Sequence, residues 1–205
     1  MGLLVPRKGI LTADFYTRAT VEVATGLLGK RLVSVQQGRL TAGWIVETEA
    51  YLPQDDSACH ATRGKTPGNR TMFGDAGYAY VYPIHTRHCF NVVTQTANAG
   101  TAVLVRAIQP TCGIDTMMRR RSNARPVDLC RGPGRLCQAM AIDRVVDGHD
   151  LTQGKRLWID DADSLTVEKE QVKVTERIGV TSAEDLPLRF VVAGNRYASG
   201  PKRMR

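Results

Sequence analysis

The feature that most constrains the fold is a succession of strand-like segments with few helical segments between them. Apolar, β-branched and aromatic residues dominate residues 30–35 and 40–51, and again residues 78–84, 89–95 and 101–108. Such segments are typical of half-buried strands. Strands that follow one another without regular crossover helices pair mostly as antiparallel neighbours. The sequence therefore predicts an α+β domain with a mostly antiparallel sheet and helices packed around it.

Helices and further strands are expected elsewhere in the chain. Thr12 is a suitable N-cap for a helix over residues 13–28 that stops at Gly29. Two more helices are expected at 114–123 and 134–142. Residues 36–39 read as a turn, and three strand-like segments follow late in the chain, at 155–160, 171–180 and 188–194.

Length and composition indicate one domain. No repeat or linker divides the 205 residues, and about ten residues at the N-terminus and eight at the C-terminus are expected to be peripheral. Residues 52–77 are polar and rich in Gly, Pro and Asp, and such a long segment is either functional or contains a short helix. The N-terminal residues lack a secretory pattern and no apolar run could span a bilayer, so a cytoplasmic location is expected.

The charge of the chain points to a polyanion as partner. Lys and Arg number 28 against 20 Asp and Glu, a net charge of +8, and they cluster at 117–126 and 200–205. Nucleic acid is one interpretation of this excess, and a merely soluble basic protein is the other.

Two acidic residues and one basic residue stand out within apolar strands. Glu47 and Glu49 lie two positions apart, so they project from the same face of their strand. Arg106 interrupts the apolar segment 101–108, and a buried arginine needs an anion as partner, which either glutamate could supply. A desolvated glutamate held in this way can take a proton from water. A solvated strand end is the plainer interpretation of the two glutamates.

Aromatic residues recur at strand spacing near these glutamates. Tyr78, Tyr80 and Tyr82 share one strand face, and Tyr51 closes the preceding strand. Core packing is the usual role of such residues. The alternative is a stacking wall for a flat ring, such as an unpaired base.

Cysteine and histidine raise the question of a metal. The five cysteines are irregularly spaced and form no CxxC pair, so reduced and mostly buried thiols are expected. A zinc hydrolase could use Cys59, His60, His85 and His88, but their spacing matches no standard zinc motif. His60 and His88 could instead donate hydrogen bonds to a phosphate or a base edge. Residues 131–140 begin a helix with Gly, Pro and Arg135, and a helix start suits a phosphate.

Taken together, several segments resemble the alkyladenine DNA glycosylase family, also called methylpurine DNA glycosylase. They run in family order from about residue 10 to 195 and read WIVETEAYL, ACHATRGKTPGNRTMFGDAGYAYVYPI, HCFNVVT, AVLVRAIQP, LCRGPGRLCQAMAI, RIGV and PLRFVV. The resemblance implies a single α+β domain around a curved antiparallel sheet. It also implies a monomeric, nucleoid-associated enzyme that excises alkylated or deaminated purines, such as 3-methyladenine and hypoxanthine. The substrate is double-stranded DNA, no metal or other cofactor takes part, and an abasic site is left.

The resemblance also implies a role for individual residues. Glu49 matches the general base, Arg106 the arginine that holds the attacking water with it, and Val180 the residue whose main-chain carbonyl contacts that water. The base pocket is matched by four residues, Tyr51, His60, Tyr82 and Asn91. Tyr51 and Tyr82 sandwich the extruded base, while Asn91 discriminates against the exocyclic amine of guanine. DNA contacts are matched by Thr66, Met72 and Arg135.

One segment departs from the family pattern. Family members usually carry Y-x-x-Y-G-M-Y, whose second tyrosine fills the gap left by the flipped base, whereas this chain reads YPIHTRHCFN and is one residue shorter. The wedge position is taken by His85, Thr86 or Arg87, next to His88. Gly134 stands where the family often has a serine. A DNA-binding module of the same fold with altered or lost excision is therefore the alternative to an active glycosylase.

Overall fold

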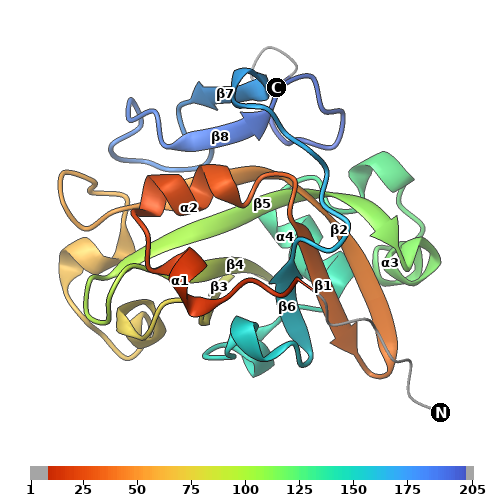
Figure 1. Ribbon diagram of the computed structural model, residues 1–205, viewed down its shortest axis with the longest axis horizontal. Coiled ribbons are helices and arrows are strands. Elements are labelled where there is room, and N and C mark those ends of the chain that lie inside the picture. The colour runs from red at the N-terminus through yellow and green to blue at the C-terminus, as the bar shows by residue number, and fades with distance from the viewer. Residues whose placement is uncertain (1–8, 202–205) are drawn as a thin grey trace.

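The computed structural model describes residues 9–201 (Figure 1). Most of the N-terminal segment expected to be peripheral, and half of the C-terminal one, lie outside the described residues.

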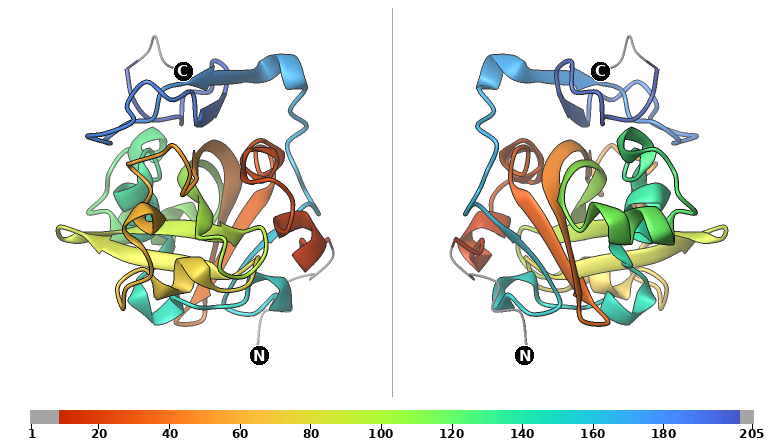
Figure 2. Two further views of the ribbon diagram at one scale, coloured as in Figure 1. Left: turned by 90° about the vertical axis from the view of Figure 1, so that its left-hand side faces the viewer. Right: turned by 90° about the vertical axis from the view of Figure 1, so that its right-hand side faces the viewer.

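In the described part of the chain, eight strands form a single sheet in which all the strand pairs are antiparallel (Figures 1 and 2). The strands are β1 (Arg31–Gln36), β2 (Arg39–Tyr51), β3 (Ala79–Ile84), β4 (Arg87–Thr94), β5 (Thr101–Cys112), β6 (Leu157–Asp160), β7 (Val172–Thr175) and β8 (Arg189–Val192). Their order is β3-β4-β5-β2-β1-β6, with β8 paired to β2 and β7 paired to β8. The expected α+β fold with a mostly antiparallel sheet is thereby confirmed.

The long strand β2 organises the sheet. One of its edges pairs with β5 along almost its whole length. Its other edge pairs with β1 over residues 39–44 and with β8 over residues 47–49. The sheet therefore divides beside β2, and the β7–β8 hairpin stands apart from β1 and β6, at the top of Figure 1. Glu47 and Glu49 lie in the part of β2 that is covered by strands on both edges.

Within residues 9–201, four short α-helices pack around the sheet. They are α1 (Ala13–Tyr16), α2 (Thr20–Gly26), α3 (Ile114–Arg120) and α4 (Pro133–Met140). The expected helix over 13–28 is wrong in its extent, because the chain leaves helical geometry between α1 and α2. There the Thr17 hydroxyl and the Arg18 guanidinium donate to main-chain carbonyls of α1, and such local bonds compete with helix continuation. Thr12 precedes α1 but makes no side-chain cap.

The segment expected as 171–180 forms a shorter strand than predicted, since β7 ends at Thr175. Six 3-10 helices complete the described secondary structure: η1 (His60–Arg63), η2 (Arg70–Phe73), η3 (Pro126–Asp128), η4 (Arg144–Val146), η5 (Leu151–Gln153) and η6 (Lys169–Gln171).

The long polar segment 52–77 is ordered by a small core of its own. It contains η1 and η2, and Cys59, Ala61 and Met72 from this segment pack with Tyr80 of β3. The buried Asn69 side chain accepts from the Thr66 N–H and donates to two main-chain carbonyls of the same segment. Packing and hydrogen bonds thus fasten this segment, which has no regular strands, beside the sheet.

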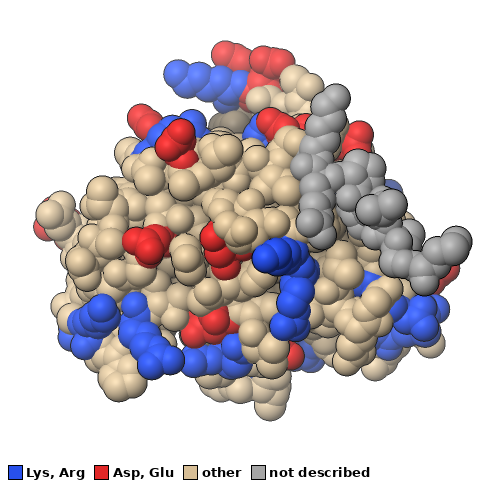
Figure 3. Space-filling view, turned by 60° about the horizontal axis from the view of Figure 1, so that its bottom comes forward, with Lys and Arg blue, Asp and Glu red and all other residues tan. Residues whose placement is uncertain are grey.

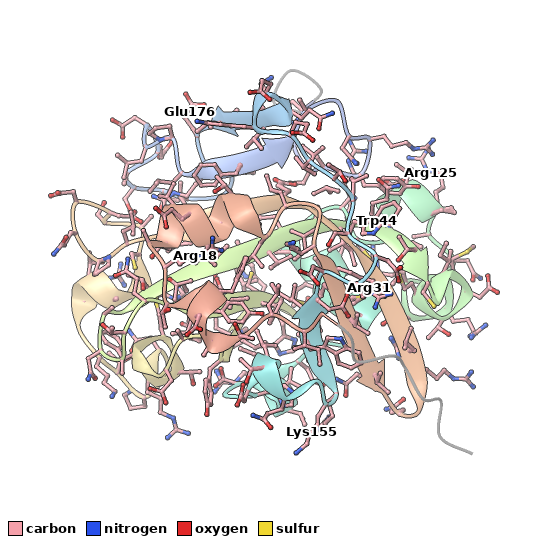
Figure 4. All side chains as sticks on the ribbon, viewed as in Figure 1. Arg18, Arg31, Trp44, Arg125, Lys155 and Glu176 are labelled. Carbon is pink, nitrogen blue, oxygen red and sulfur yellow. The ribbon has the colours of Figure 1, made fainter. Side chains whose placement is uncertain are left out.

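The two faces of β2 have different neighbours. The Thr48 hydroxyl donates to the Ala24 carbonyl of α2, so this face lies under the helix. Glu47 and Glu49 project from the opposite face. Farther along the sheet, Arg31 and Trp44 lie side by side on β1 and β2 (Figure 4), and both bind Asp163 in the connection that leads to β7.

Charged side chains are distributed over the surface. On the face shown in Figure 3, Lys and Arg gather along the lower rim, with acidic side chains between them. Positive and negative side chains are therefore interspersed along this rim.

Candidate active site

Glu47, Glu49 and Arg106 form the centre of the site, and all three side chains are buried. Arg106 lies on β5, where its two chain neighbours pair with successive residues of β2, so Arg106 is the extra residue of a β-bulge. Bulges re-aim side chains and are common next to active sites. Here Arg106 Nε donates to Glu47 Oε1 at 3.0 Å and Nη1 donates to Glu49 Oε2 at 3.2 Å. One guanidinium therefore bridges both carboxylates.

Glu49 is held by three donors. Besides Arg106, the Tyr51 hydroxyl donates to Glu49 Oε2 at 2.9 Å, and the main-chain N–H of Ile178 donates to Oε1 at 2.8 Å. The Ile178 carbonyl in turn accepts from Arg106 Nη1 at 3.0 Å. Strand β2, strand β5 and the segment after β7 thus converge on one carboxylate.

Glu47 is bound by a different set of groups, which do not line the cavity described below. Arg189 Nε donates to Glu47 Oε1 at 2.7 Å, and the Ser199 N–H and hydroxyl donate to its two oxygens at 2.6 and 2.8 Å. Burial by itself raises the pKa of Glu47, but Arg106 and Arg189 outweigh it and hold that pKa below its ordinary value. Burial by itself lowers the pKa of Arg106, but the two glutamates outweigh it and hold that pKa above its usual value.

A cavity of about 730 Å³ lies against this network. It is lined by all four residues matched to the base pocket, Tyr51, His60, Tyr82 and Asn91, and also by Thr66, Met72 and Val180. Glu49 itself has no exposed surface. Its carboxylate accepts a hydrogen bond from Tyr51, which lines the cavity. Burial raises the pKa of Tyr51 and Tyr82, so both phenols stay neutral and can donate.

Aromatic rings and polar groups meet in this cavity. The ring of His60 lies 4.6 Å from that of Tyr82, and His60 Nδ1 is 2.9 Å from the Tyr80 hydroxyl. Burial, with a smaller effect from Arg63, lowers the pKa of His60 below its ordinary value, so the imidazole is neutral at pH 7. The buried amide of Asn91 donates to the Tyr80 carbonyl at 3.1 Å.

The main-chain groups beside Glu49 and Arg106 are those of Ile178 and not those of Val180. Val180 lies two residues later on the cavity wall, between Gly179 and Thr181. The sequence does not separate the two positions, because both are β-branched residues of the same short segment.

A groove of about 570 Å³ opens beside Arg106. It is lined by Arg87, Arg106, Arg131 and Arg135 and by the glycines at the start of α4. Asp128 lies 3.7 Å from Arg131 and 3.9 Å from Arg135. Arg106 is already bound to Glu47 and Glu49, but Arg87, Arg131 and Arg135 together outnumber Asp128, so the groove suits an anion.

The β3–β4 hairpin carries the residues matched to the wedge. Its turn consists of His85 and Thr86, with Ile84 and Arg87 paired on either side, and His85 has a φ of 51°. The Arg87 guanidinium donates to the Gln138 side chain of α4, which draws it away from the tip. Ile84 is 44% exposed and lines the 730 Å³ cavity that contains Tyr51 and Tyr82, the tyrosine cavity. His88 faces a smaller cavity together with Thr86 and Arg87.

The cysteines and histidines are not assembled for a metal. Within residues 9–201, no group of three His, Cys, Asp or Glu side chains is placed to hold an ion. All five cysteines are free, and only Cys112 is exposed. Burial raises the pKa of Cys59 to about 11, which makes it a poor thiolate ligand at neutral pH.

Comparison with known proteins identifies the family. Residues 14–196 match the model of the family described as Methylpurine-DNA glycosylase (MPG). The chain belongs to the methylpurine-DNA glycosylase family. It is therefore a DNA glycosylase, an enzyme that hydrolyses N-glycosidic bonds, and its substrate is DNA. Within the described residues, no helix is long and apolar enough to cross a membrane.

Relatives of this glycosylase cover nearly its whole length. It is 46% identical over 195 residues to a protein of Rhodopirellula baltica and 48% identical over 190 residues to one of Methanoculleus marisnigri, each named "Putative 3-methyladenine DNA glycosylase". The alignments cover 93% and 92% of this chain and 83% and 98% of the relatives.

Some residues that build the glycosylase site were not predicted from the sequence. Arg189 interrupts the apolar segment LRFVV just as Arg106 interrupts its own strand, so the same signal could have found it. Ile178 acts through its main-chain N–H and carbonyl, and Ser199 through its main-chain N–H as well as its hydroxyl. Residue type carries no signal for a main-chain contact.

Proposed function

We propose that this glycosylase removes purines of the 3-methyladenine and hypoxanthine type from double-stranded DNA and leaves an abasic site with an intact strand. The observation that carries the proposal is the buried Glu49, held by Arg106, Tyr51 and the Ile178 N–H directly behind a cavity lined by tyrosines. A carboxylate in that position can act on the sugar attached to a base that occupies the cavity.

The damaged nucleotide must leave the duplex to reach this cavity. Extrusion costs a few kcal/mol and is easiest for damaged or mispaired bases. The flipped base lies between Tyr51 and Tyr82, with His60 and Asn91 at its edge. A methylated purine such as 3-methyladenine is cationic, and the π faces of the tyrosines favour it over a neutral base. Hypoxanthine is neutral and needs a proton before it leaves.

Glu49 then acts on the sugar and on water. Cleavage of the glycosidic bond develops positive charge on the sugar, as in glycoside hydrolysis, and the ionised carboxylate stabilises it. Glu49 Oε1 accepts one hydrogen bond, from Ile178, and a carboxylate oxygen can accept a second from an attacking water. Glu49 takes the proton of that water as general base. The Ile178 carbonyl, which accepts from Arg106, can help to orient this water, together with the Val180 carbonyl matched to that role.

One assay tests this function against its alternatives. Duplexes that contain hypoxanthine, and methylated DNA that contains 3-methyladenine, are incubated with the protein with and without a chelator. We expect base release, seen as strand cleavage after alkali, and no effect of the chelator. Band shifts without base release would indicate a DNA-binding module that has lost excision, and loss of activity with the chelator would indicate metal chemistry.

The arginine groove is expected to hold the DNA backbone. Replacing Arg135 with alanine should weaken binding about equally for damaged and undamaged duplexes and reduce the slope of log affinity against log salt by about 1. Lys155→Ala is the matched control, because exposed Lys155 lines neither the tyrosine cavity nor the groove. An unchanged salt slope for Arg135→Ala would remove the groove from the DNA contact surface.

The hairpin tip is expected to fill the gap that the flipped base leaves. Apolar wedges are the usual device for this, and Ile84 is the exposed apolar residue beside His85. We expect His85→Ala and Ile84→Ser to lower the flipped population several-fold, by fluorescence of a base analogue opposite the lesion, and to change the single-turnover rate less. Lys155→Ala, which lies in neither the hairpin nor the two DNA-facing cavities, serves as comparison. Wild-type fluorescence in both tip variants would rule out the tip as wedge.

A further inference from the structure

A second buried ion pair lies directly behind the tyrosine cavity. Arg177 Nη1 and Nη2 donate to the two oxygens of Asp56 at 2.7 and 2.6 Å, and neither side chain has more than 1% exposed surface. The guanidinium carbon lies 4.6 Å from the centre of the Tyr51 ring. Tyr51 lines the cavity and Arg177 does not, so the ring separates the cation from the space where a base would lie.

This pair joins three segments of the cavity wall. Besides binding Asp56 in the segment after β2, Arg177 donates to the Ala50 carbonyl of β2 at 3.1 Å and to the Ala183 carbonyl at 3.4 Å. Asp56 in turn accepts from the main-chain N–H groups of Leu52 and Ala58. The residues on either side of these anchors line the cavity, at 57–60 and 179–182.

The hydrogen bonds of Arg177 are incomplete on the side of its Nε. That nitrogen is buried and has no hydrogen-bond partner among the described residues. A clamp that served only to fasten the loops would gain from satisfying every donor. Burial by itself lowers the pKa of Arg177, but Asp56 raises it above the ordinary value, so a cation remains beside the ring.

We propose that Arg177 is a positioning residue that fixes Tyr51 from behind, and that its neutralisation by Asp56 lets the cavity accept a cationic purine. The inference rests on the proposed function, because it concerns the base that enters the same cavity. A cation on the rear face of Tyr51 would repel a cationic base on the front face. The carboxylate of Asp56 cancels most of that repulsion, since opposite charges in hydrogen-bond contact act at a distance as a dipole.

The two charges can be removed separately. The experiment uses a Glu49→Gln background, in which the lesion stays in the duplex, and measures dissociation constants for duplexes with a cationic N-methylated purine and with hypoxanthine. Asp56→Asn leaves Arg177 without its anion and should weaken binding of the cationic lesion about tenfold relative to hypoxanthine. The double variant Asp56→Asn with Arg177→Met removes both charges and should abolish this shift in the ratio.

The ratio separates a charge effect from a structural one, because a loosened wall weakens binding of both lesions alike. The inference would be overturned if the ratio of the two dissociation constants, for the cationic lesion and for hypoxanthine, stayed within twofold of the Glu49→Gln parent when Asp56→Asn is added. Should Asp56→Asn fail to fold, Arg177→Gln is the second variant. It leaves the Asp56 carboxylate without its cation and must strengthen binding of the cationic lesion relative to hypoxanthine. Equal affinity of the parent for damaged and undamaged duplexes would also overturn it. Lack of base release by the protein with Glu49 intact would instead overturn the proposed function.

Discussion

Replacing Glu49 with glutamine is expected to lower the single-turnover rate of base release by about 10²–10⁴-fold, the usual contribution of a general base. Glutamine keeps the shape of the side chain, but its single amide oxygen can replace only one of the two carboxylate oxygens that accept from Tyr51 and from the Ile178 N–H. It carries no charge to stabilise the sugar and cannot take a proton from water. Binding to a duplex with a damaged purine should be retained, because the cavity and the arginine groove are unchanged.

The measurement pairs a base-release assay at saturating enzyme with a gel-shift titration of the same duplex. Glu176→Gln is the matched control, since Glu176 is an exposed residue at the top of the molecule (Figure 4) and lines neither cavity nor groove. A rate for Glu49→Gln within tenfold of the wild type would show that another group activates the water.

Replacing Glu47 with glutamine is expected to have its largest effect on stability. Glu47 has no exposed surface, and the change leaves Arg106 and Arg189 without their common anion. Removing one member of a buried ion pair costs about 3–5 kcal/mol. For a chain of this size, each kcal/mol corresponds to about 2–4 °C, so the melting temperature should fall by about 6–20 °C. Glu176→Gln should melt within about 2 °C of the wild type.

The same change should alter the response of stability to acid. The folded-state pKa of Glu47 lies below its ordinary value near 4.5. The stabilisation it provides is therefore complete above pH 4.5 and is lost as the pH falls through the folded-state pKa. Wild-type stability should consequently decline more steeply than that of Glu47→Gln in this range, as measured by urea unfolding at several pH values. Parallel curves for the two proteins would contradict the ion-pair role of Glu47.

The two predictions assign different work to two glutamates on one strand face. Repulsion between them is tolerated because Arg106 bridges both carboxylates and Arg189 adds a second positive charge beside Glu47. Glu47 holds Arg106 in place from one side. Arg106 can then orient Glu49 from the other, while Glu49 keeps its contacts with Tyr51 and the segment after β7.

The sequence by itself determined the class of fold and the family. Alternating apolar residues are a local property of each strand, so α3, α4 and most strands were predicted close to their observed bounds, although β5 continues to Cys112 and not only to residue 108. Arg106 in an apolar strand predicted a buried ion pair, because a charge cannot be buried there without a partner. The ends of the first helix and of β7 were predicted poorly, since side-chain and tertiary contacts decide them.

Only the tertiary structure decided which residues meet. The bulge that turns Arg106 onto both glutamates, the main-chain groups of Ile178, and the Asp56–Arg177 pair behind Tyr51 join segments that lie 57 to 129 residues apart along the chain. Sequence periodicity reports which face of one element is buried, and it does not report which distant element covers that face. The chemistry of the site depends on those distant contacts, because a carboxylate becomes useful only through the donors that surround it.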